Sequence, residues 1–331
     1  MNSYGNVSEW LKAQFEKADK KPFPILSFPA VQLLNVSVKD MISDSTLQAE
    51  GIIRIDEKFN MAAAQGFMDL SLEAEAFGAH AVYSDDEIPT ITGQLISTPE
   101  EADALKVPEI GDGRTCVVLE AVKKVKEKIT DKPFFAECIG PFSLAGRLMD
   151  VNEAMYNCYD EPEMVHTLLG KATEFIIKYM KALKEAGADG VIMAEPLAGI
   201  LSPQLSLEFS SEYIKQIVEA VQDDEFAIIY HNCGNNVVFQ AEGIFSLGCR
   251  GYHFGNAIRL LDMLEKAPDD VFVFGNIPPA NVMVAGTPED IKAAKESLKA
   301  ECGGYKNFWL SSGCDLPPKT PIVNIEALFT E

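Results

Sequence analysis

Short apolar runs alternate with longer amphipathic segments along most of the chain. Most of these runs are apolar at nearly every position rather than at every second one. This pattern is typical of parallel strands that are covered on both faces. We therefore predict strands at eight runs, which span residues 24–30, 79–85, 134–140, 188–196, 226–233, 251–255, 271–277 and 307–314.

The segments between these runs carry the signals with which helices begin and end. Thr287 is followed by Pro288 and two acidic residues, which predicts an N-cap and a first helical turn. A long amphipathic segment begins at Glu161 and reaches Gly187, a residue type that commonly ends helices, just before the run at 188–196. Predicted strands and helices thus alternate.

The alternation of strands and helices predicts the fold class. Eight strands separated by helices in a chain of 331 residues match a (β/α)8 (TIM) barrel. An open, doubly wound α/β sheet is the alternative, because the number of strands is hard to fix from one sequence. We expect residues 1–331 to form a single barrel domain, with residues 1–23 as an N-terminal helical extension.

The end of the run at 226–233 is unusual, because it places His231 and Cys233 two residues apart. Residues i and i+2 of a strand point to the same side, so this imidazole and this thiol can reach a common point. Cys314 closes the last predicted strand, and active sites of barrels lie at the carboxyl ends of strands. One histidine and two cysteines suit Zn²⁺ with one open position. The alternative interpretation is that these are ordinary cysteines at strand ends and that the histidine lies beside them by chance.

Further polar residues follow other predicted strands. Asp85 and Asp86 lie at the end of the second predicted strand, and Glu195 lies at the end of the fourth. His253 lies at the end of the sixth predicted strand, and Asn276 at the end of the seventh. We expect Asp85, His253 and Asn276 to line the binding site of a cofactor, the alternative for His253 being a buried structural histidine. His80 and His166 are interpreted as structural.

Composition restricts the partners and the compartment. The formal net charge of −22 argues against nucleic acid and against anionic membrane surfaces as partners. The apolar runs are too short for a transmembrane helix, and the N-terminal segment lacks the apolar core of a signal peptide. Seven cysteines without a C-x-x-C pair do not resemble a disulfide framework, so we expect a cytoplasmic protein. The cysteines outside the predicted site are interpreted as small buried hydrophobic residues: Cys116, Cys138, Cys158, Cys249 and Cys302.

Five stretches, taken in order, resemble the uroporphyrinogen decarboxylase superfamily: GPFSLAGRL, AGADGVIMAEPLAGILSP, IIYHNCGN, FGNIPP and SSGCDLPPKTPIVNIEAL. Within it they are similar to the zinc-dependent corrinoid methyltransferase branch, the methylcobalamin:coenzyme M methyltransferases. The resemblance extends from about residue 60 to the end of the chain and implies a (β/α)8 barrel. Carried over by position, it implies that His231, Cys233 and Cys314 are zinc ligands.

The resemblance also implies a reaction. A zinc ion with an open position deprotonates a bound thiol, and only the thiolate is a good nucleophile. The sulfur then takes the methyl group of a methyl-corrinoid, which is carried by a small corrinoid protein, and a small thiol such as coenzyme M is the acceptor. Glu195 would contact the zinc or take the thiol proton, the alternative being a solvated carboxylate at the rim.

One motif departs from the resemblance. At the seventh predicted strand the family usually has G-N-x-D-P, whereas this chain has Gly275-Asn276-Ile277-Pro278-Pro279. The missing aspartate leaves the identity of the acceptor thiol open.

Two alternatives belong to other functional classes. Uroporphyrinogen carries eight carboxylates, so a decarboxylase of this fold should place several arginines in its pocket. The chain has only five arginines, and none lies in the segment PFPILSFPAVQLLN, where the decarboxylases carry an arginine-containing motif. A corrinoid- or metal-binding accessory protein needs only the fold and the ligands, and it would hold zinc without transferring methyl groups.

Overall fold

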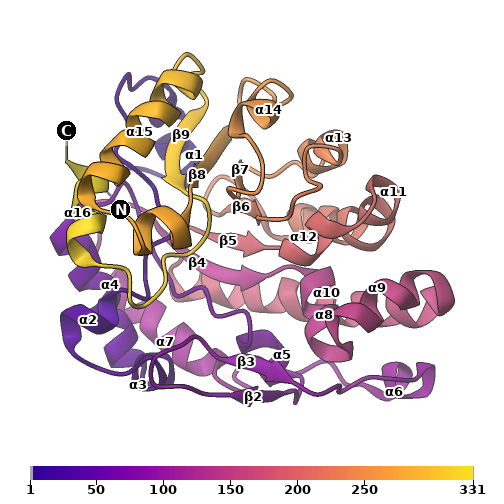
Figure 1. The fold of residues 1–331 in the computed structure, drawn as a ribbon. Helices are drawn as coiled ribbons and strands as arrows, with labels where there is room; N and C mark the ends of the chain where they lie inside the picture. Colours follow the sequence, from indigo (N-terminus) through magenta and orange to yellow (C-terminus); the bar gives the residue numbers. More distant parts are fainter. Residues whose placement is uncertain (1–2, 331) are drawn as a thin grey trace.

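The computed structural model describes residues 3–330, in which a parallel sheet curls into a barrel with most of the helices packed outside it (Figure 1). The sheet has seven strands in the order β1-β4-β5-β6-β7-β8-β9, and all neighbours are parallel. The strands are β1 (Ala64–Gln65), β4 (Phe134–Ile139), β5 (Gly190–Ala194), β6 (Ala227–Asn232), β7 (Gly251–Phe254), β8 (Phe272–Ile277) and β9 (Phe308–Ser312). Every residue of these strands is buried, as the continuous apolar runs predict.

An extended segment, residues 23–28, fills the position between β9 and β1 and completes the barrel. Its amides donate hydrogen bonds to both neighbouring strands, β9 and β1. Phe23 N donates to the backbone oxygen of Leu310 at 2.8 Å. The other two acceptors are side chains, because Ile25 N donates to Ser312 Oγ at 3.0 Å and Leu26 N donates to Gln65 Oε1 at 3.1 Å. The strand predicted at 24–30 therefore lies in the barrel, but it lacks a regular backbone ladder.

The prediction of a barrel strand at 79–85 is wrong. Within it, β2 (His80–Val82) pairs antiparallel with β3 (Thr90–Thr92) in a separate hairpin at the lower edge of Figure 1. Both strands alternate between exposed and half-buried residues, whereas the barrel strands are buried throughout. The second barrel strand is β1, which is too short to stand out as an apolar run.

The helices begin and end largely as the sequence predicts. Thr287 Oγ1 accepts from Asp290 N in a capping box, and Gly187 ends the long helix with a left-handed φ of 109°. The α-helices are α1 (Val7–Phe15), α2 (Ala30–Leu34), α3 (Val38–Ser43), α4 (Ser45–Phe59), α5 (Leu72–Ala76), α6 (Pro99–Ala104), α7 (Thr115–Lys126), α8 (Pro141–Met149), α9 (Val151–Asp160), α10 (Pro162–Ala186), α11 (Pro203–Ser206), α12 (Glu212–Val221), α13 (Ala241–Phe245), α14 (Leu260–Leu264), α15 (Pro288–Cys302) and α16 (Ile322–Phe329). Among residues 3–330, no helix combines the length and the hydropathy needed to cross a membrane.

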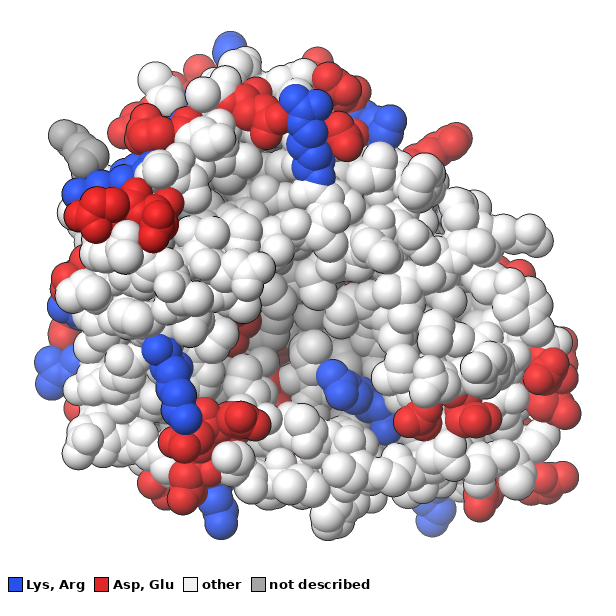
Figure 2. Space-filling view, viewed as in Figure 1, with Lys and Arg blue, Asp and Glu red and all other residues white. Residues whose placement is uncertain are grey.

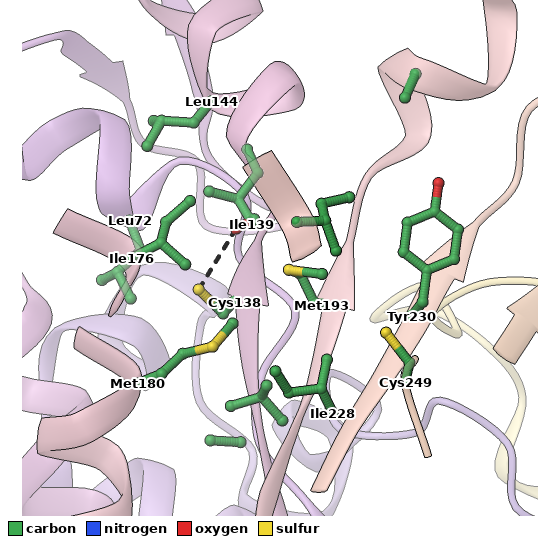
Figure 3. Close-up of a cluster of buried hydrophobic side chains, with 14 of the residues drawn as sticks. Leu72, Cys138, Ile139, Leu144, Ile176, Met180, Met193, Ile228, Tyr230 and Cys249 are labelled. Carbon is green, nitrogen blue, oxygen red and sulfur yellow. Dashed lines mark hydrogen bonds between the residues drawn. The ribbon is translucent and has the colours of Figure 1, made fainter. Parts of the chain in front are cut away.

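Two apolar clusters hold the barrel together. The larger one lies between the sheet and the outer helices, and Figure 3 shows part of it. The smaller one fills the inside of the barrel with aromatic side chains, among them Phe135, Phe274 and Trp309. Trp10 of α1 joins this inner cluster, with its ring 5.6 Å from that of Trp309. Within the predicted extension, of which residues 1–2 lie outside the described part of the chain, α1 packs against the barrel interior.

Four of the five cysteines outside the predicted site are buried, as expected: Cys138, Cys158, Cys249 and Cys302. Figure 3 shows Cys138 and Cys249 among apolar side chains. Burial raises the pKa of each of these four thiols, which keeps them protonated and unreactive. The prediction is wrong for Cys116, which is exposed on α7 because it lies on the solvent side of that helix's first turn.

Candidate metal centre

The three predicted metal ligands converge at the mouth of the barrel. The ligand atoms of His231, Cys233 and Cys314 all lie within 4.8 Å of one another. His231 Nε2 lies 3.5 Å from Cys314 Sγ. A tetrahedral zinc ion with ordinary Zn–N and Zn–S bonds holds such a nitrogen and sulfur about 3.6 Å apart. The residues present therefore fit a zinc ion with little rearrangement.

Two glycines allow loops from distant strands to meet at this point. A Cβ atom at Gly255, after β7, would lie 2.5 Å from Cys233 Cβ. A Cβ atom at Gly313, after β9, would lie 2.8 to 3.0 Å from atoms of Asn256. Both cysteine-bearing loops thus pack closely on the loop that follows β7, which brings Cys233 and Cys314 together although β6 and β9 are not neighbours.

A chain of hydrogen bonds fixes the proton on His231. Ser311 Oγ donates to the carbonyl oxygen of Phe23 at 2.7 Å, so it accepts from His253 Nε2–H at 2.8 Å. His253 Nδ1 then carries a lone pair and accepts from His231 Nδ1–H at 2.8 Å. His231 Nε2 is left without a proton, and it faces Cys314. This is the tautomer that binds a metal through Nε2.

Burial and hydrogen bonding shift the pKa values of the site in directions that support these proton positions. Burial lowers the pKa of His253 well below its usual value, so this imidazole stays neutral between its two partners. The hydrogen bond with Cys314 lowers the pKa of Cys233, which makes Cys233 the thiolate of the cysteine pair. The same hydrogen bond raises the pKa of Cys314.

A cavity of about 490 Å³ opens beside Cys314. Its walls come from the residues after β1, the turn between β2 and β3, Arg147 of α8, and the segment from Cys314 to Lys319. The space-filling view shows a hollow near the centre of this face, with acidic atoms visible inside it (Figure 2). The cavity gives a small molecule access to Cys314.

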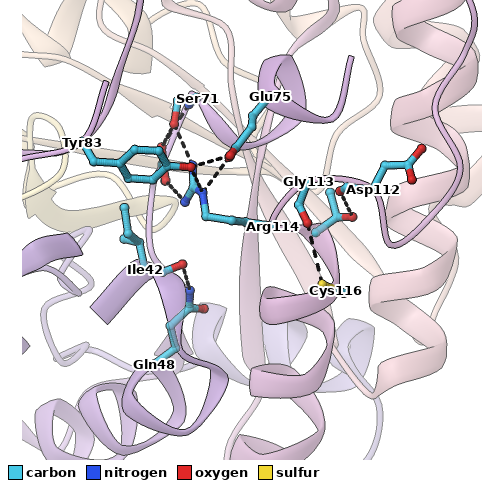
Figure 4. A network of polar contacts seen from close by, with 11 residues as sticks. Ile42, Gln48, Ser71, Glu75, Tyr83, Asp112, Gly113, Arg114 and Cys116 are labelled. Atoms are coloured by element: carbon cyan, nitrogen blue, oxygen red, sulfur yellow. Dashed lines mark hydrogen bonds and ion pairs between the residues drawn. The ribbon is translucent and has the colours of Figure 1, made fainter. Parts of the chain in front are cut away.

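A buried network anchors the cavity wall that follows β1. Arg114 Nη1 pairs with Asp69 Oδ2 at 2.5 Å, Nη2 donates to Ser71 Oγ at 2.9 Å, and Nε pairs with Glu75 Oε2 at 2.6 Å. Tyr83 donates to Glu75 and accepts from Arg114 Nε at 3.0 Å (Figure 4). The network ties α7, α5 and β2 to the loop whose Met68 and Leu70 line the cavity.

Glu195 does not occupy the predicted position. Its carboxylate accepts from the amides of Phe142 and Ser143, both at 2.8 Å, and from Ser210 Oγ at 2.9 Å. These amides belong to the first turn of α8, so the buried carboxylate caps that helix from outside the barrel. A zinc contact or a role as acceptor of the thiol proton does not fit this arrangement, and Glu195 is not part of the described ligand cluster.

The three residues predicted to line a cofactor site lie outside the cavity wall. His253 is fully buried behind His231, where it orients the metal ligand. Asn276 donates from Nδ2 to the carbonyl oxygens of Gly255 and Ile258, both at 3.0 Å, and so positions the loop after β7. Asp85 is exposed after β2, while its neighbour Asp86 lines the cavity and pairs with a lysine at 3.2 Å.

Three charged residues near the centre were missed by the sequence analysis. Arg147 and Asp315 line the cavity, and Glu137 lies on the inner face of β4, two residues after Phe135 of the inner cluster. A signal for Glu137 was present, because it is the only charged residue in the buried run FFAECI. Arg147 and Asp315 lie within the helix and the loop that follow strands, where apolar periodicity carries no information about which side chains face a cavity.

The fold and the site together define a TIM-type barrel with a His-Cys-Cys cluster, of a geometry suited to a metal ion, at the carboxyl ends of its strands. The chain belongs to the family described as uroporphyrinogen decarboxylase (URO-D), whose model matches residues 26–331.

The relatives within this family carry two different names. "Methylcobamide:CoM methyltransferase MtbA" of Methanosarcina acetivorans is 29% identical over 78% of this chain and 76% of its own length. "Uroporphyrinogen decarboxylase" of Psychromonas ingrahamii is 24% identical over 86% of this chain and 83% of its own length. Among solved structures, a methyltransferase from Methanosarcina mazei superposes with a TM-score of 0.86 at 24% identity, over 99% of this chain and 97% of that one. This likeness establishes the barrel fold.

Proposed function

We propose that the protein transfers a methyl group from a methyl-corrinoid to a small thiol, with a zinc ion held by His231, Cys233 and Cys314. The observation that carries this proposal is the convergence of the three ligand atoms within 4.8 Å beside an open cavity. The similarity to methylcobamide:CoM methyltransferases supports the same reaction class.

The residues of the chain prepare the site for a thiol. The hydrogen bonds through His253 and Ser311 keep a lone pair on His231 Nε2. A bound zinc ion would lower the pKa of a thiol in its fourth position and so supply the thiolate nucleophile. The cavity beside Cys314 would admit the acceptor, and the methyl donor would approach from the carboxyl side of the strands.

The bond changes of the reaction are balanced. The sulfur lone pair forms the new S–CH₃ bond, and the Co–CH₃ bond breaks with both of its electrons left on cobalt. The thiol proton goes to solvent, and the products are a methyl thioether and a Co(I) corrinoid. The reaction requires neither an external oxidant nor an external reductant.

The charges in the cavity argue against the decarboxylase reaction. Four of the five arginines form ion pairs with acidic residues elsewhere in the structure: Arg54, Arg114, Arg250 and Arg259. Arg147 is the only arginine in the cavity wall, and Lys319, its other cation, pairs with Asp86, which leaves too little positive charge for a substrate with eight carboxylates. A metal-binding accessory role is distinguished by turnover, since an accessory protein would not consume the methyl donor.

The proposed partners follow from the reaction. A corrinoid protein would present the methyl group at the barrel mouth, and zinc would be the resident metal. Seven free cysteines, four of them buried and protonated, suit a reducing cytoplasm.

The test is a zinc-dependent methyl-transfer assay. Purified zinc-loaded protein is mixed with methylcobalamin and a panel of small thiols, and loss of the methylcobalamin absorbance is followed together with formation of the thioether. We expect turnover with at least one thiol, and a decrease of at least a hundredfold in the His231→Ala protein. Decarboxylation of uroporphyrinogen by metal-free protein, without methyl transfer to any thiol, would overturn the proposal.

A further inference from the structure

Arg147 is a cation without a partner. Within residues 3–330, it forms no ion pair or hydrogen bond, although the chain carries 50 acidic residues. It is half-buried on α8 and lines the cavity beside Cys314. Burial lowers the pKa of Arg147, the direction expected of a guanidinium held away from water. A partly desolvated cation at a cavity wall is suited to an anionic group of a ligand.

Two carboxylates, Asp315 of the cavity wall and Glu137 of the barrel interior, also lack partners. Both carboxylate oxygens of Asp315 and both of Glu137 are covered from solvent, and none has a hydrogen-bond partner among the described residues. Asp315 lines the cavity, whereas Glu137 lies on the inner face of β4, where burial, and after it the nearby Asp315, raises its pKa well above the usual value. Buried carboxylates without donors are rare in native proteins, because desolvation costs free energy that a donor normally offsets. Both side chains are therefore free to accept from a donor that a ligand supplies.

We propose that the methyl acceptor is a zwitterionic amino-acid thiol, with its carboxylate on Arg147 and its ammonium group on Asp315 and Glu137. This inference rests on the proposed function and specifies its substrate. Asp315 directly follows the metal ligand Cys314, so an ammonium group a few bonds from the reacting sulfur reaches it. An acceptor with only an acidic group would satisfy Arg147 and leave both carboxylates without a donor.

The experiment compares four thiols that differ in one charged group at a time. L-homocysteine carries both groups, 4-mercaptobutyrate lacks the amine, 3-mercaptopropylamine lacks the carboxylate, and 2-mercaptoethanesulfonate carries an anionic group alone. Methyl transfer from methylcobalamin gives kcat and KM for each thiol, and calorimetry gives Kd for the zinc-loaded protein. We expect kcat/KM for homocysteine to exceed that for each other thiol by about tenfold or more, the value of one charge-assisted hydrogen bond.

Three near-isosteric variants assign the two charged groups. Arg147→Gln should raise KM about tenfold for homocysteine and 4-mercaptobutyrate and leave 3-mercaptopropylamine unchanged. Asp315→Asn and Glu137→Gln should raise KM for the two thiols that carry an amine, homocysteine and 3-mercaptopropylamine. They should leave KM for 4-mercaptobutyrate unchanged. Arg54→Gln, at an exposed ion pair, is the matched control and should change none of these values. Zinc content and thermal unfolding of each variant verify the metal site and the fold.

The outcomes separate this inference from the proposed function. Methyl transfer to 2-mercaptoethanesulfonate or 4-mercaptobutyrate as efficient as to homocysteine, with no effect of Glu137→Gln, would overturn the inference and leave the methyltransferase function intact. If no thiol is methylated, the proposed function fails. The Kd values from calorimetry then still show whether the protein binds a zwitterionic thiol. Homocysteine binding that is lost in Arg147→Gln and in Asp315→Asn would support the inference, and equal binding of all four thiols would contradict it.

Discussion

At the scale of single residues, the direction of a side chain at the end of a strand decides whether it belongs to the candidate metal centre. Side chains that point into the barrel reach the centre, and those that point outward do not. On β6, Ala227 and Ile229 face the inside of the barrel, and His231 continues that face. On β5, Ala194 faces inside, so the next residue, Glu195, faces outside and meets α8 instead of the metal centre. Two polar residues at the ends of neighbouring strands thus have different functions because they differ by one position in register.

The residue whose role changes most in the structure is His253, and its effect on zinc can be measured. His253→Phe removes the acceptor for His231 Nδ1–H, which leaves that donor unsatisfied and no longer fixes the tautomer. We expect zinc affinity to fall about 10- to 100-fold, as measured by competition with a chromophoric chelator. His166→Phe, at a half-buried histidine outside the site, is the control. Unchanged affinity in His253→Phe would show that His231 needs no such support.

At the scale of elements, α8 is the link between the capping carboxylate and the substrate cavity. Its first turn is held by the Glu195 carboxylate, and its last turn carries Arg147 into the cavity wall. The carboxylate is fully buried, and burial raises its pKa, so its three hydrogen bonds offset a desolvation cost. Glu195 therefore acts on the cavity through the position of a helix.

Replacing Glu195 tests this structural role against the catalytic one. Glu195→Gln turns an amide donor toward backbone amides that themselves need an acceptor, so we expect about 3 kcal/mol lower free energy of unfolding in urea. Zinc content should stay at about one ion per chain. Glu100→Gln, at an exposed position, should change neither quantity. Loss of zinc without loss of stability would instead restore the direct role at the metal.

The elements also show which parts of the fold the sequence could predict. Seven of the eight predicted runs occupy barrel positions, because residues buried on both faces of a parallel sheet must be apolar. The strand β1 was missed because two residues are too few to form a pattern. The run at 79–85 was misassigned because a hairpin with one half-covered face is also rich in apolar residues.

The site was predictable only where local spacing determined it. His231 and Cys233 are two residues apart on one strand, and Cys314 follows the end of another, so the strand-end rule was enough to place them together. Arg147, Asp315 and Glu137 could not be grouped from the sequence, because their proximity depends on how a helix, a loop and a strand pack.

At the scale of the whole molecule, the two ends of the barrel differ in access. The α1 helix packs its Trp10 against the aromatic side chains that fill the interior from the amino-terminal end. The opposite end carries the cavity and, in the loops after β5 and β6, the exposed apolar side chains Ile200 and Phe239. A protein partner that reaches the metal centre must therefore approach the carboxyl ends of the strands.

A charge on this face should weaken such an approach. Phe239 is 75% exposed, and Phe239→Asp should raise KM for a methylated corrinoid protein about tenfold while leaving turnover of free methylcobalamin unchanged. Lys17→Gln, which makes the same charge change of −1 at the amino-terminal side, is the matched control. An equal effect of the two variants, or cross-links from the corrinoid carrier to the α1 side, would place the docking surface elsewhere.

The closed amino-terminal end has a consequence for the kinetics. Because α1 and the aromatic cluster fill the barrel interior from the amino-terminal end, a corrinoid carrier seated over the mouth beside the cavity would block the path by which the thiol enters. Substrate addition should then follow a compulsory order, with the thiol bound before the carrier docks and the thioether released after the carrier leaves. An excess of carrier would trap the enzyme in an unproductive complex, so the initial rate should pass through a maximum as the carrier concentration rises at low thiol.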